Sequence, residues 1–489
     1  INLSGTYKSI VENGGIFALN NGLSGTIDVT GNIVVDIEAG GMAFSSDGAL
    51  NIYLASLITG TGTLEINLKD PTSKLAILDS PGTISLSSIG TAYAPGSVIT
   101  PQVMISLAST PNYTPFSITK GTLIVDQTVN LDNTTDSYNK SDFINSSVDV
   151  NSAITGTNSG QLAVGQVNYG SGSLASDRAR ITLNNNSTID LSGNNSTGML
   201  ADFGDITNAG GSFIKVTGDE SVGIYAANST AVTNAGTINI GNKSVGIYGV
   251  NYLDGVTSSL ILGYGVNYLS GPESYGSGTI NINNNGNIIS TGTTHGGYGI
   301  FANDTAALGS TITLGSSSNI DVSSGDAGIG IYAVNSTLNI DGNITVGKDG
   351  VGIYASGSTG NINGGTMSLN GDNAIGYYLT NGSAFTNLGG SIAVNGQNIT
   401  LMITDASSSI NLSTPFTVNS APGSTYVVGN MIGGDFYNNT SATLGSNGSL
   451  INGIGTAALF GLSSNINSTG TNVSGMVLSG QHSGVPGHV

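Results

Sequence analysis

Apolar and polar residues alternate over short stretches of this chain, and one stretch recurs at nearly regular steps. Its clearest copy is Ser-Val-Gly-Ile-Tyr-Ala at 221–226. Alternation of this kind is typical of a half-buried β-strand, so each copy predicts one strand. Five close copies and one degenerate copy follow the same pattern, at 244–249, 297–302, 328–333, 350–355, 374–379 and 196–201.

A second alternating string lies between these copies, as in Thr-Ile-Asn-Ile at 237–240 and Thr-Leu-Asn-Ile at 337–340. The central glycines of the first string are mostly 22 to 25 residues apart, with single steps of 31 and 53 residues. Asn, Gly, Ser and Asp fill the gaps, and these residues tolerate turn and left-handed conformations. One repeat therefore predicts two or three short strands joined by turns.

A single repeat of this length cannot bury its own apolar face, but stacked repeats bury it when each strand pairs in parallel with its equivalent one turn later. A repeat period between 20 and 50 residues is the general mark of such an architecture. We therefore predict an all-β fold, a right-handed parallel β-helix (β-solenoid) with loop insertions.

Strict alternation also assigns the motif residues to two faces. In the first copy, Val222, Ile224 and Ala226 are predicted to share the inner face, and Gly223 and Tyr225 the outer one. The equivalent aromatic positions then form an outward ladder. Stacked rings in such a ladder stabilise neighbouring turns, or alternatively they offer an exposed stripe to sugars or partner proteins. The ladder consists of Tyr225, Tyr248, Phe301, Tyr332, Tyr354 and Tyr378.

The regularity of the repeat divides the chain into four predicted segments. Residues 1–70 are expected to form N-terminal turns of the β-helix. Residues 71–180 contain six of the ten prolines, which cannot donate to a strand ladder, and predict irregular turns with a loop-rich insertion that protrudes. Residues 181–405 are the regular array, interrupted by an insertion at 250–277, and residues 406–489 are the C-terminal turns.

The insertion at 250–277 is the candidate ligand-binding region, because insertions in solenoids become surface loops that often carry binding. It repeats Val-Asn-Tyr-Leu and concentrates tyrosines. Tyrosine rings would stack on a sugar or anchor a protein, and the polar side chains would hydrogen-bond to hydroxyl groups. The alternative is an extra turn or hairpin whose tyrosines pack on the solenoid. The candidate residues are Asn251, Tyr252, Asp254, Tyr264, Tyr268, Glu273 and Tyr275.

Charge and cysteine content exclude several functions. The chain has 29 acidic and 10 basic residues, a net charge of −19, which argues against binding to nucleic acid. No Lys or Arg occurs from Asp349 to Val489. The absence of cysteine rules out disulfides and thiolate sites for metals. No apolar run reaches 18 residues, so we expect no membrane-spanning helix in this chain.

Catalytic chemistry is poorly represented, and we expect no enzyme activity, metal or cofactor. The carboxylate pairs Asp202 with Asp205 and Asp321 with Asp326 have no nearby Arg or His, and Asp in Asn- and Gly-rich turns is usually a turn former. The three histidines are His295, His482 and His488. Neither the calcium-binding nonapeptide nor a phosphate-binding loop is present.

The Gly-Ile-Tyr-Ala strings, with Asn-x-Gly-Thr-Ile before them, resemble the passenger regions of the large autotransporter adhesins of fusobacteria. The resemblance is best over 181–405 and weakest over 71–180. It implies a type V secreted virulence protein with a β-helical passenger outside the cell and a C-terminal outer-membrane barrel that this chain lacks. Such proteins are implicated in coaggregation with bacteria and in binding galactose-type sugars and immune receptors. The motif itself is structural and transfers no binding residue.

From these observations we expect a monomeric extracellular fragment of a bacterial surface adhesin, cut from a longer protein and not itself inserted in a membrane. Its partner would be a host glycan, a host receptor protein or another bacterium. A second interpretation is a passive β-helical stalk that presents a distal binding region. A third is a β-helix enzyme that degrades polysaccharides, which would require carboxylates converging on one groove.

Overall fold

The computed structural model describes the chain in segments, and within them it is β-strand and turn apart from one 3-10 turn, η1 (Leu131–Asn133). Two compact units are present: one comprises Ile1–Lys215 with Thr257–Glu273, and the other Val216–Val256 with Ser274–Val489. The described residues are 2–3, 6–12, 27–40, 42–46, 51–52, 58–59, 63–69, 74–78, 83–85, 98–99, 103–107, 116–118, 121–133, 147–165, 181–202, 204–228, 230–251, 278–304, 307–386, 389–412, 416–431, 434–438, 442–454, 458–462, 466–468 and 471–479.

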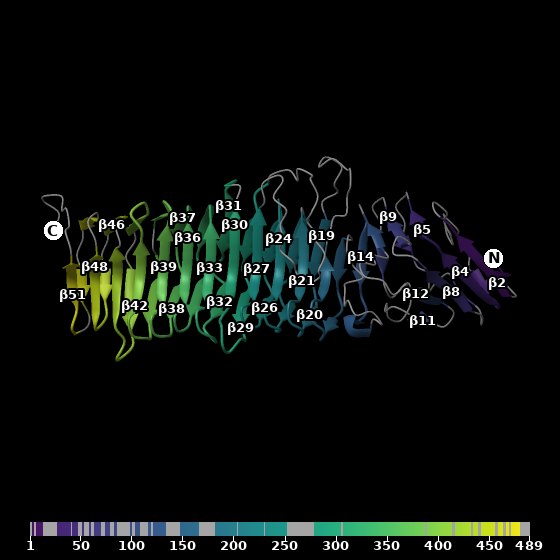
Figure 1. Cartoon of the computed structure of the whole chain (residues 1–489), viewed down its shortest axis with the longest axis horizontal. Helices are drawn as coiled ribbons and strands as arrows, with labels where there is room; N and C mark the ends of the chain where they lie inside the picture. Colours follow the sequence, from purple (N-terminus) through teal and green to yellow (C-terminus); the bar gives the residue numbers. More distant parts are fainter. Residues whose placement is uncertain are drawn as a thin grey trace. The chain divides into compact units, whose positions relative to one another are not determined.

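The second unit is a coil with three strands in each turn (Figure 1). Equivalent strands of successive turns lie side by side, so the unit has three parallel sheets. We call the sheet that contains the Gly-Ile-Tyr strings the tyrosine sheet. Its strands are β24 (Val222–Ala227), β27 (Val245–Asn251), β30 (Tyr298–Asp304), β33 (Ile329–Val334), β36 (Val351–Ser356), β39 (Ile375–Thr380), β42 (Ile399–Thr404), β45 (Tyr426–Met431), β48 (Gly448–Ile454) and β51 (Ser474–Ser479).

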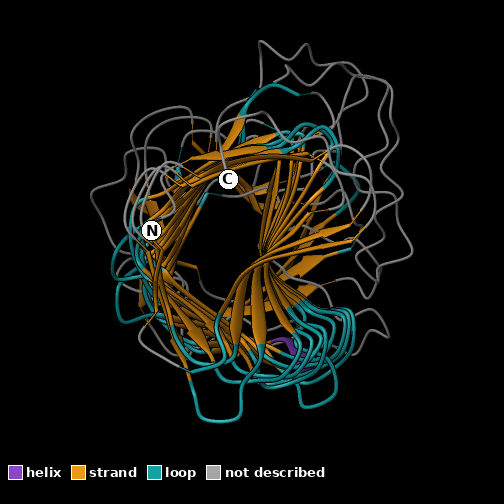
Figure 2. Ribbon diagram, turned by 90° about the vertical axis from the view of Figure 1, so that its left-hand side faces the viewer, coloured by secondary structure: helices purple, strands orange, loops and turns teal. Residues whose placement is uncertain are grey.

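The other two sheets of this unit alternate with the tyrosine sheet along the chain, and turns join them at the corners (Figure 2). The second sheet consists of β25 (Ala231–Asn234), β28 (Asn281–Asn284), β31 (Ser310–Leu314), β34 (Ser336–Ile340), β37 (Thr359–Ile362), β40 (Ala384–Thr386), β43 (Ser409–Leu412), β46 (Gly434–Asn438) and β49 (Ala458–Leu462). The third sheet consists of β26 (Thr237–Ile240), β29 (Asn287–Ser290), β32 (Asn319–Val322), β35 (Asn343–Val346), β38 (Thr366–Leu369), β41 (Ser391–Val394), β44 (Phe416–Ser420), β47 (Ala442–Leu444) and β50 (Ile466–Ser468).

Register within the sheets follows the sequence repeat. In the tyrosine sheet, Tyr225 pairs with Tyr248, and Ile247 pairs with Ile300 one turn later. Pairing in parallel with the equivalent strand satisfies the backbone of each turn from its neighbours and stacks like side chains on like. The predicted all-β parallel β-helix is confirmed.

The first unit is also built from short parallel strands. Its boundary with the second unit falls within β23 (Phe213–Val216), and its one antiparallel pair among the described strands is β11 (Val98–Ile99) with β12 (Val103–Leu107). The earlier strands are β1 (Asn2–Leu3), β2 (Thr6–Val11), β3 (Ile27–Val29), β4 (Asn32–Ile37), β5 (Met42–Ser46), β6 (Asn51–Ile52), β7 (Ile58–Thr59), β8 (Thr63–Leu68), β9 (Lys74–Leu78), β10 (Thr83–Ser85), β11 (Val98–Ile99), β12 (Val103–Leu107) and β13 (Phe116–Ile118). The later ones are β14 (Thr122–Val125), β15 (Val129–Asn130), β16 (Val148–Val150), β17 (Ile154–Gly156), β18 (Leu162–Gly165), β19 (Ile181–Asn185), β20 (Thr188–Leu191), β21 (Thr197–Asp202) and β22 (Gly204–Asn208).

The four predicted segments are not delimited by the structure and stay a prediction. Within the second unit, parallel pairing runs through the described strands up to residue 405 and continues from β43 to β51 beyond it. The antiparallel β11–β12 pair lies within 71–180, where the prolines predict irregular turns. In the part of the chain that the structure describes, no helix has the length and hydropathy that crossing a bilayer requires.

The core of the second unit consists of columns of aliphatic side chains, one per turn. Ile238, Ile288, Ile320 and Ile344 follow one another in the third sheet and are fully buried or nearly so. Burying one such side chain contributes about 1.5–3 kcal/mol relative to leaving it in water. Repetition of this column along the unit therefore supplies a large part of its stability.

The motif glycine breaks the predicted alternation. A Cβ atom on Gly330 would lie 2.5 Å from Cγ2 of Ile344 and 2.6 Å from the carbonyl oxygen of Gly352, so the position faces the interior. The strand register accordingly passes from Ile329 to Ile331 without pairing Gly330. The prediction that the glycine shares the outer face with tyrosine is wrong. The residue before it lies on the outer face instead, as the half-exposed Ile329 and Val351 show.

Asparagine takes eight of the thirteen left-handed positions that are not glycine among the described residues, in line with the predicted turn role of Asn. A short polar side chain tolerates this conformation better than other residues that carry a Cβ. Turns that need a left-handed residue therefore account for part of the high asparagine content. The asparagines with positive φ are Asn195, Asn228, Asn335, Asn373, Asn381, Asn398, Asn447 and Asn472.

Buried polar side chains form a second kind of ladder that the sequence did not reveal. Nδ2 of Asn234 donates to Oδ1 of Asn284 at 2.6 Å, and Nδ2 of Asn284 donates to Oγ of Ser318 at 2.5 Å. In the first unit, Nδ2 of Asn185 donates to Oδ1 of Asn208 at 2.9 Å. These contacts satisfy polar groups inside the coil where a turn leaves a strand.

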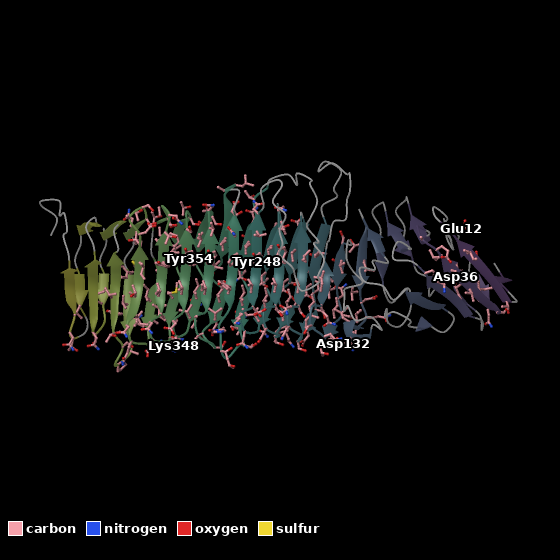
Figure 3. The ribbon with its side chains drawn as sticks, viewed as in Figure 1. Glu12, Asp36, Asp132, Tyr248, Lys348 and Tyr354 are labelled. Atoms are coloured by element: carbon pink, nitrogen blue, oxygen red, sulfur yellow. The ribbon has the colours of Figure 1, made fainter. Side chains whose placement is uncertain are left out.

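Asp132, labelled in Figure 3, joins two successive turns of the first unit. Its carboxylate accepts from Thr157 N at 2.9 and 2.8 Å, Thr157 Oγ1 at 2.8 Å, Asn158 N at 3.2 Å and Gln161 Nε2 at 2.9 Å. Desolvation acts to raise the pKa of Asp132, but these hydrogen bonds outweigh it and hold the pKa below its usual value. In the second unit, hydrogen bonds from Asn381, Ser408 and Ser407 overcome desolvation and lower the pKa of Asp405 in the same way.

We expect this arrangement to make stability fall in acid. Because the folded-state pKa of Asp132 is lowered, its contribution is complete above about pH 5 and is lost as the pH falls through the lowered pKa. Asp132→Asn should therefore destabilise the protein at pH 7 and reduce the further loss on acidification. Denaturation midpoints of both proteins across acid pH provide the measurement. An equal gap between them at neutral and strongly acidic pH would contradict the role of the carboxylate.

Candidate functional site

The aromatic residues of the tyrosine sheet form a continuous stack, with Tyr248 and Tyr354 labelled in Figure 3. Ring centroids of Tyr248 and Phe301 are 4.8 Å apart, those of Phe301 and Tyr332 are 4.6 Å apart, and those of Tyr332 and Tyr354 are 4.7 Å apart. The planes differ by 9°, 1° and 6° in the same order. The spacing is that of neighbouring strands, so the parallel register itself produces the stack.

The ends of the stack differ from its middle. Tyr225 stacks on Tyr248 at 5.1 Å and lies opposite it in the ladder, so its ring is on the predicted outer face, but it is covered there and only 1% exposed. Tyr378 is tilted by 60° to Tyr354 at 5.4 Å. From Tyr248 to Tyr378 the aromatic residues are half-exposed on the outer face, as predicted.

Stacking decides between the two interpretations of the ladder for its central rings. Phe301 and Tyr354 cover the two faces of Tyr332, and the edge of Tyr298 contacts Phe301 and Tyr332 at 5.6 and 6.3 Å. A sugar that stacks on an aromatic residue needs an open ring face. The central rings therefore brace neighbouring turns and present only their edges and hydroxyl groups to a partner.

The phenol of Tyr332 stays protonated at physiological pH. Partial burial, followed by the neighbouring phenols of Tyr354 and Tyr298, raises its pKa above the ordinary value. Tyr377, the next residue to the ladder member Tyr378, points the other way and is buried beside Phe385, at 6.2 Å between centroids. Complete burial raises the pKa of Tyr377 as well.

A row of mostly aliphatic side chains runs beside the ladder on the same outer face. Its members precede the motif glycine, pair in register from strand to strand, and are half-exposed. One charged residue, Asp304, occurs in strands β27, β30, β33, β36 and β39. Its side chain is 1% exposed and accepts hydrogen bonds from N and Oγ of Ser310. We call this row and the adjoining rings the outer stripe: Val245, Tyr298, Ile329, Val351 and Ile375 with Tyr248, Phe301, Tyr332, Tyr354 and Tyr378.

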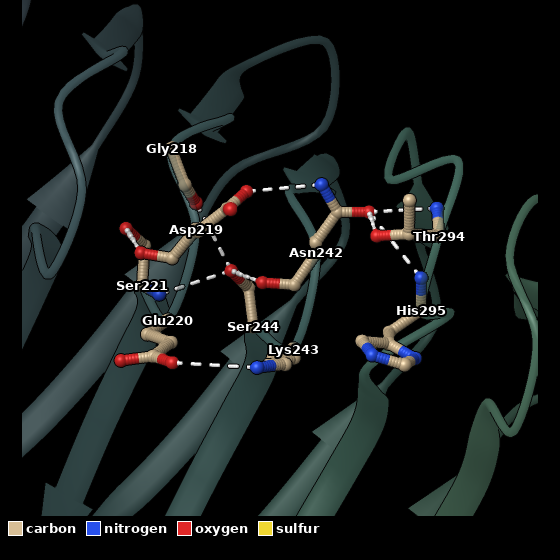
Figure 4. A network of polar contacts seen from close by, with 9 residues as sticks. All are labelled: Gly218, Asp219, Glu220, Ser221, Asn242, Lys243, Ser244, Thr294 and His295. Carbon is tan, nitrogen blue, oxygen red and sulfur yellow. Dashed lines mark hydrogen bonds and ion pairs between the residues drawn. The ribbon is translucent and has the colours of Figure 1, made fainter.

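Polar and charged side chains border the outer stripe at the turns that precede its strands (Figure 4). Nδ2 of Asn242 donates to Asp219 at 3.0 Å, and Oδ1 of Asn242 accepts from Thr294 N at 3.0 Å and from His295 N at 3.3 Å. Nζ of Lys243 lies 3.8 Å from the Glu220 carboxylate. An uncharged centre with a charged rim is the composition found in protein interfaces.

The residues predicted to bind a ligand are largely outside the described part of the chain. Tyr252, Asp254, Tyr264, Tyr268, Glu273 and Tyr275 fall there, and their site stays a prediction. Asn251 is described: its side chain is fully buried, and Nδ2 donates to the carbonyl of Gly278 at 2.6 Å. This residue closes the end of β27, and a surface contact to a ligand is not open to it.

The carboxylates considered for catalysis take part in local structure where they are described. Asp321 accepts from N and Oγ of Ser323 at 3.0 and 2.6 Å, the pattern of a turn former. Asp326 pairs with Nζ of Lys348 at 3.3 Å. Over the described ranges, no group of three or more His, Asp or Glu side chains is arranged to hold a metal ion. The side chain of Asp202, together with His482 and His488, lies outside that part.

Comparison of the chain with family models, curated proteins and solved structures finds no match in any of the three. The resemblance to autotransporter passengers thus rests on the repeated Gly-Ile-Tyr-Ala strings alone. The outer stripe is the candidate functional surface, because the repeated motif places uncharged aliphatic and aromatic side chains side by side on it.

Proposed function

We propose that this chain is an extracellular passenger segment of a bacterial autotransporter adhesin and that it attaches to host cells or to other bacteria. The outer stripe is the observation that carries the proposal. Ten apolar or aromatic residues from five successive turns share one uncharged, half-buried face in a chain with a net charge of −19. A contiguous apolar row of this kind suits the anchoring centre of an interaction site.

The dimensions of the outer stripe fit the centre of an interface. Five strands at about 4.8 Å spacing and two side-chain rows about 10 Å apart give a footprint on the order of 200 Å². A standard protein interface buries about 800 Å² on each partner. The stripe would therefore supply the anchoring centre, and the polar turns beside it would supply the rim.

Covered ring faces favour a protein partner over a sugar at the outer stripe. Edges, hydroxyl groups and branched aliphatic side chains match the mixed surface of a protein, whereas sugars prefer open aromatic faces. Recognition of a glycan would then depend on the predicted loop site at 252–275, which includes Tyr264 and Tyr268. The proposal assigns attachment in the first place to a protein receptor.

The test is binding of the purified fluorescent chain to epithelial cells before and after enzymatic removal of surface glycans. We expect binding that survives deglycosylation and is lost after mild proteolysis of the cell surface. Loss on deglycosylation alone would shift the site to the tyrosine-rich insertion. Absence of binding to epithelial cells and to partner bacteria would contradict the proposal and favour a passive stalk, for which uninterrupted turns suffice.

A further inference from the structure

Two neighbouring tyrosines in the ladder are placed for a covalent modification. The ladder contains three Tyr–Tyr steps, of which Tyr225–Tyr248 includes a buried ring and Tyr354–Tyr378 is tilted by 60°. Tyr332 and Tyr354 alone combine a parallel arrangement, at 4.7 Å and 6°, with half-exposure of both rings. Phe301 separates this pair from Tyr248 and has no phenol to oxidise.

We infer that Tyr332 and Tyr354 are a site of dityrosine cross-linking. A one-electron oxidant would produce a carbon–carbon bond between the two rings and thereby link β33 to β36 covalently. The register fixes the pair, because Tyr332 lies directly opposite Tyr354 in the parallel ladder. Two radicals formed there are already neighbours, so coupling does not wait for an encounter between distant residues. The inference is independent of the proposed adhesin function.

The chemistry balances with an oxidant that accepts two electrons in single-electron steps, such as a peroxidase with hydrogen peroxide or a photosensitiser with persulfate. Each phenol loses one electron and its hydroxyl proton to give a tyrosyl radical. The two radicals join at the ring carbons next to the hydroxyl group. The hydrogens on those carbons then shift to the oxygens, which restores both phenols. Overall two protons and two electrons leave, and persulfate becomes two sulfates.

The positions of the lysine residues allow this bond to be detected by trypsin digestion. Lys348 lies between the two tyrosines, the preceding Lys is Lys243, and no Lys or Arg follows to Val489. Trypsin applied to the unfolded protein therefore separates residues 244–348, which contain Tyr332, from residues 349–489, which contain Tyr354. A Tyr332–Tyr354 bond keeps these two fragments together, whereas coupling of Tyr354 with Tyr378 does not.

The experiment oxidises the dilute, folded chain with a photosensitised ruthenium complex and persulfate, then unfolds it and digests it with trypsin. We expect a joined 244–348/349–489 species with dityrosine fluorescence, and mass spectrometry after a second protease should locate the bond at Tyr332 and Tyr354. Undigested protein should stay monomeric in size on a denaturing gel. Separate fragments with no joined species would overturn the inference.

Three comparisons make the result specific to the geometry. Tyr332→Phe keeps the stacked ring but removes the phenol, so the joined species should be lost. Tyr377→Phe removes a buried phenol one residue from the ladder and should leave the yield unchanged. Oxidation in concentrated urea, which the photochemical reagent tolerates, should also abolish the product. A joined species that persists in Tyr332→Phe or in urea would show coupling without the stack.

Discussion

Gly330→Ala is expected to lower the free energy of unfolding by about 2–3 kcal/mol, because overpacking of a close-packed site costs this much. The new methyl group would meet Cγ2 of Ile344 at 2.5 Å and the carbonyl oxygen of Gly352 at 2.6 Å. The isoleucine belongs to a buried column, and the carbonyl belongs to the backbone of the next turn, so no side-chain rotation relieves the overlap. The turns must move apart locally.

The effect is best measured by amide hydrogen exchange in β33 and β36 together with the denaturation midpoint, since long repeat arrays lose strict two-state behaviour. Gly210→Ala is the matched control, because a Cβ there would meet no atom within 4 Å. That variant should unfold like the parent protein. Equal midpoints for Gly330→Ala and Gly210→Ala would contradict the inward placement of the motif glycine.

Tyr332→Ala is expected to cost about 2–3 kcal/mol, since it removes contacts to three aromatic rings that contribute about 0.5–1.5 kcal/mol each beyond their buried area. The rings are those of Phe301, Tyr354 and Tyr298. The loss follows from the bracing role of the ladder, in which every ring supports the turns on both sides. A ring that served only as a ligand contact would be removable at little cost.

Tyr332→Phe provides the control for this prediction. It keeps the ring and its stacking while removing the half-exposed hydroxyl group, so its stability should be close to that of the parent. Thermal and chemical denaturation of the two variants separate the contribution of the ring from that of the phenol. Equal and small losses for both variants would show that the ladder contributes little to the stability of the coil.

The sequence predicts the fold well because equivalent positions of the repeat determine which residues pair between neighbouring strands. Once Tyr225, Tyr248 and Phe301 occupy equivalent positions, parallel pairing of equivalent strands follows, and the structure has this pairing. Alternation alone, however, places Gly330 on the outer face. The error arises because a residue without a side chain gives no hydrophobic signal, and the reason for the glycine lies in Ile344, on a different sheet.

The buried polar ladder escapes sequence analysis for a related reason. Asn234, Asn284 and Ser318 look like ordinary turn residues in a chain rich in Asn and Ser. Their burial depends on which turns stack directly, and that depends on the length of the insertion between Asn234 and Asn284. The signal that could have indicated it is an Asn at the last position of β25 and β28, as also at the last position of β19 and β22 in the first unit.

The candidate site was predicted only in outline. Periodicity identifies the aromatic ladder and its outward direction, but ring stacking, which closes the ring faces, is a three-dimensional result. The aliphatic row of the outer stripe was assigned to the inner face, because the offset introduced by the glycine is invisible in the pattern. Asn251 was chosen for its polar side chain, but that side chain is buried and donates to the carbonyl of Gly278, a contact between residues 27 positions apart that the sequence does not reveal.

The most direct test of the outer stripe compares two pairs of added lysines in the cell-binding measurement. Val351→Lys with Ile375→Lys places two charges on neighbouring strands of the stripe, where the two positions pair in register. Thr337→Lys with Thr359→Lys adds the same charges at paired, exposed positions of the second sheet. With β structure retained in both, we predict lost binding for the first pair and parental binding for the second. Equal binding by both pairs would contradict attachment through the outer stripe.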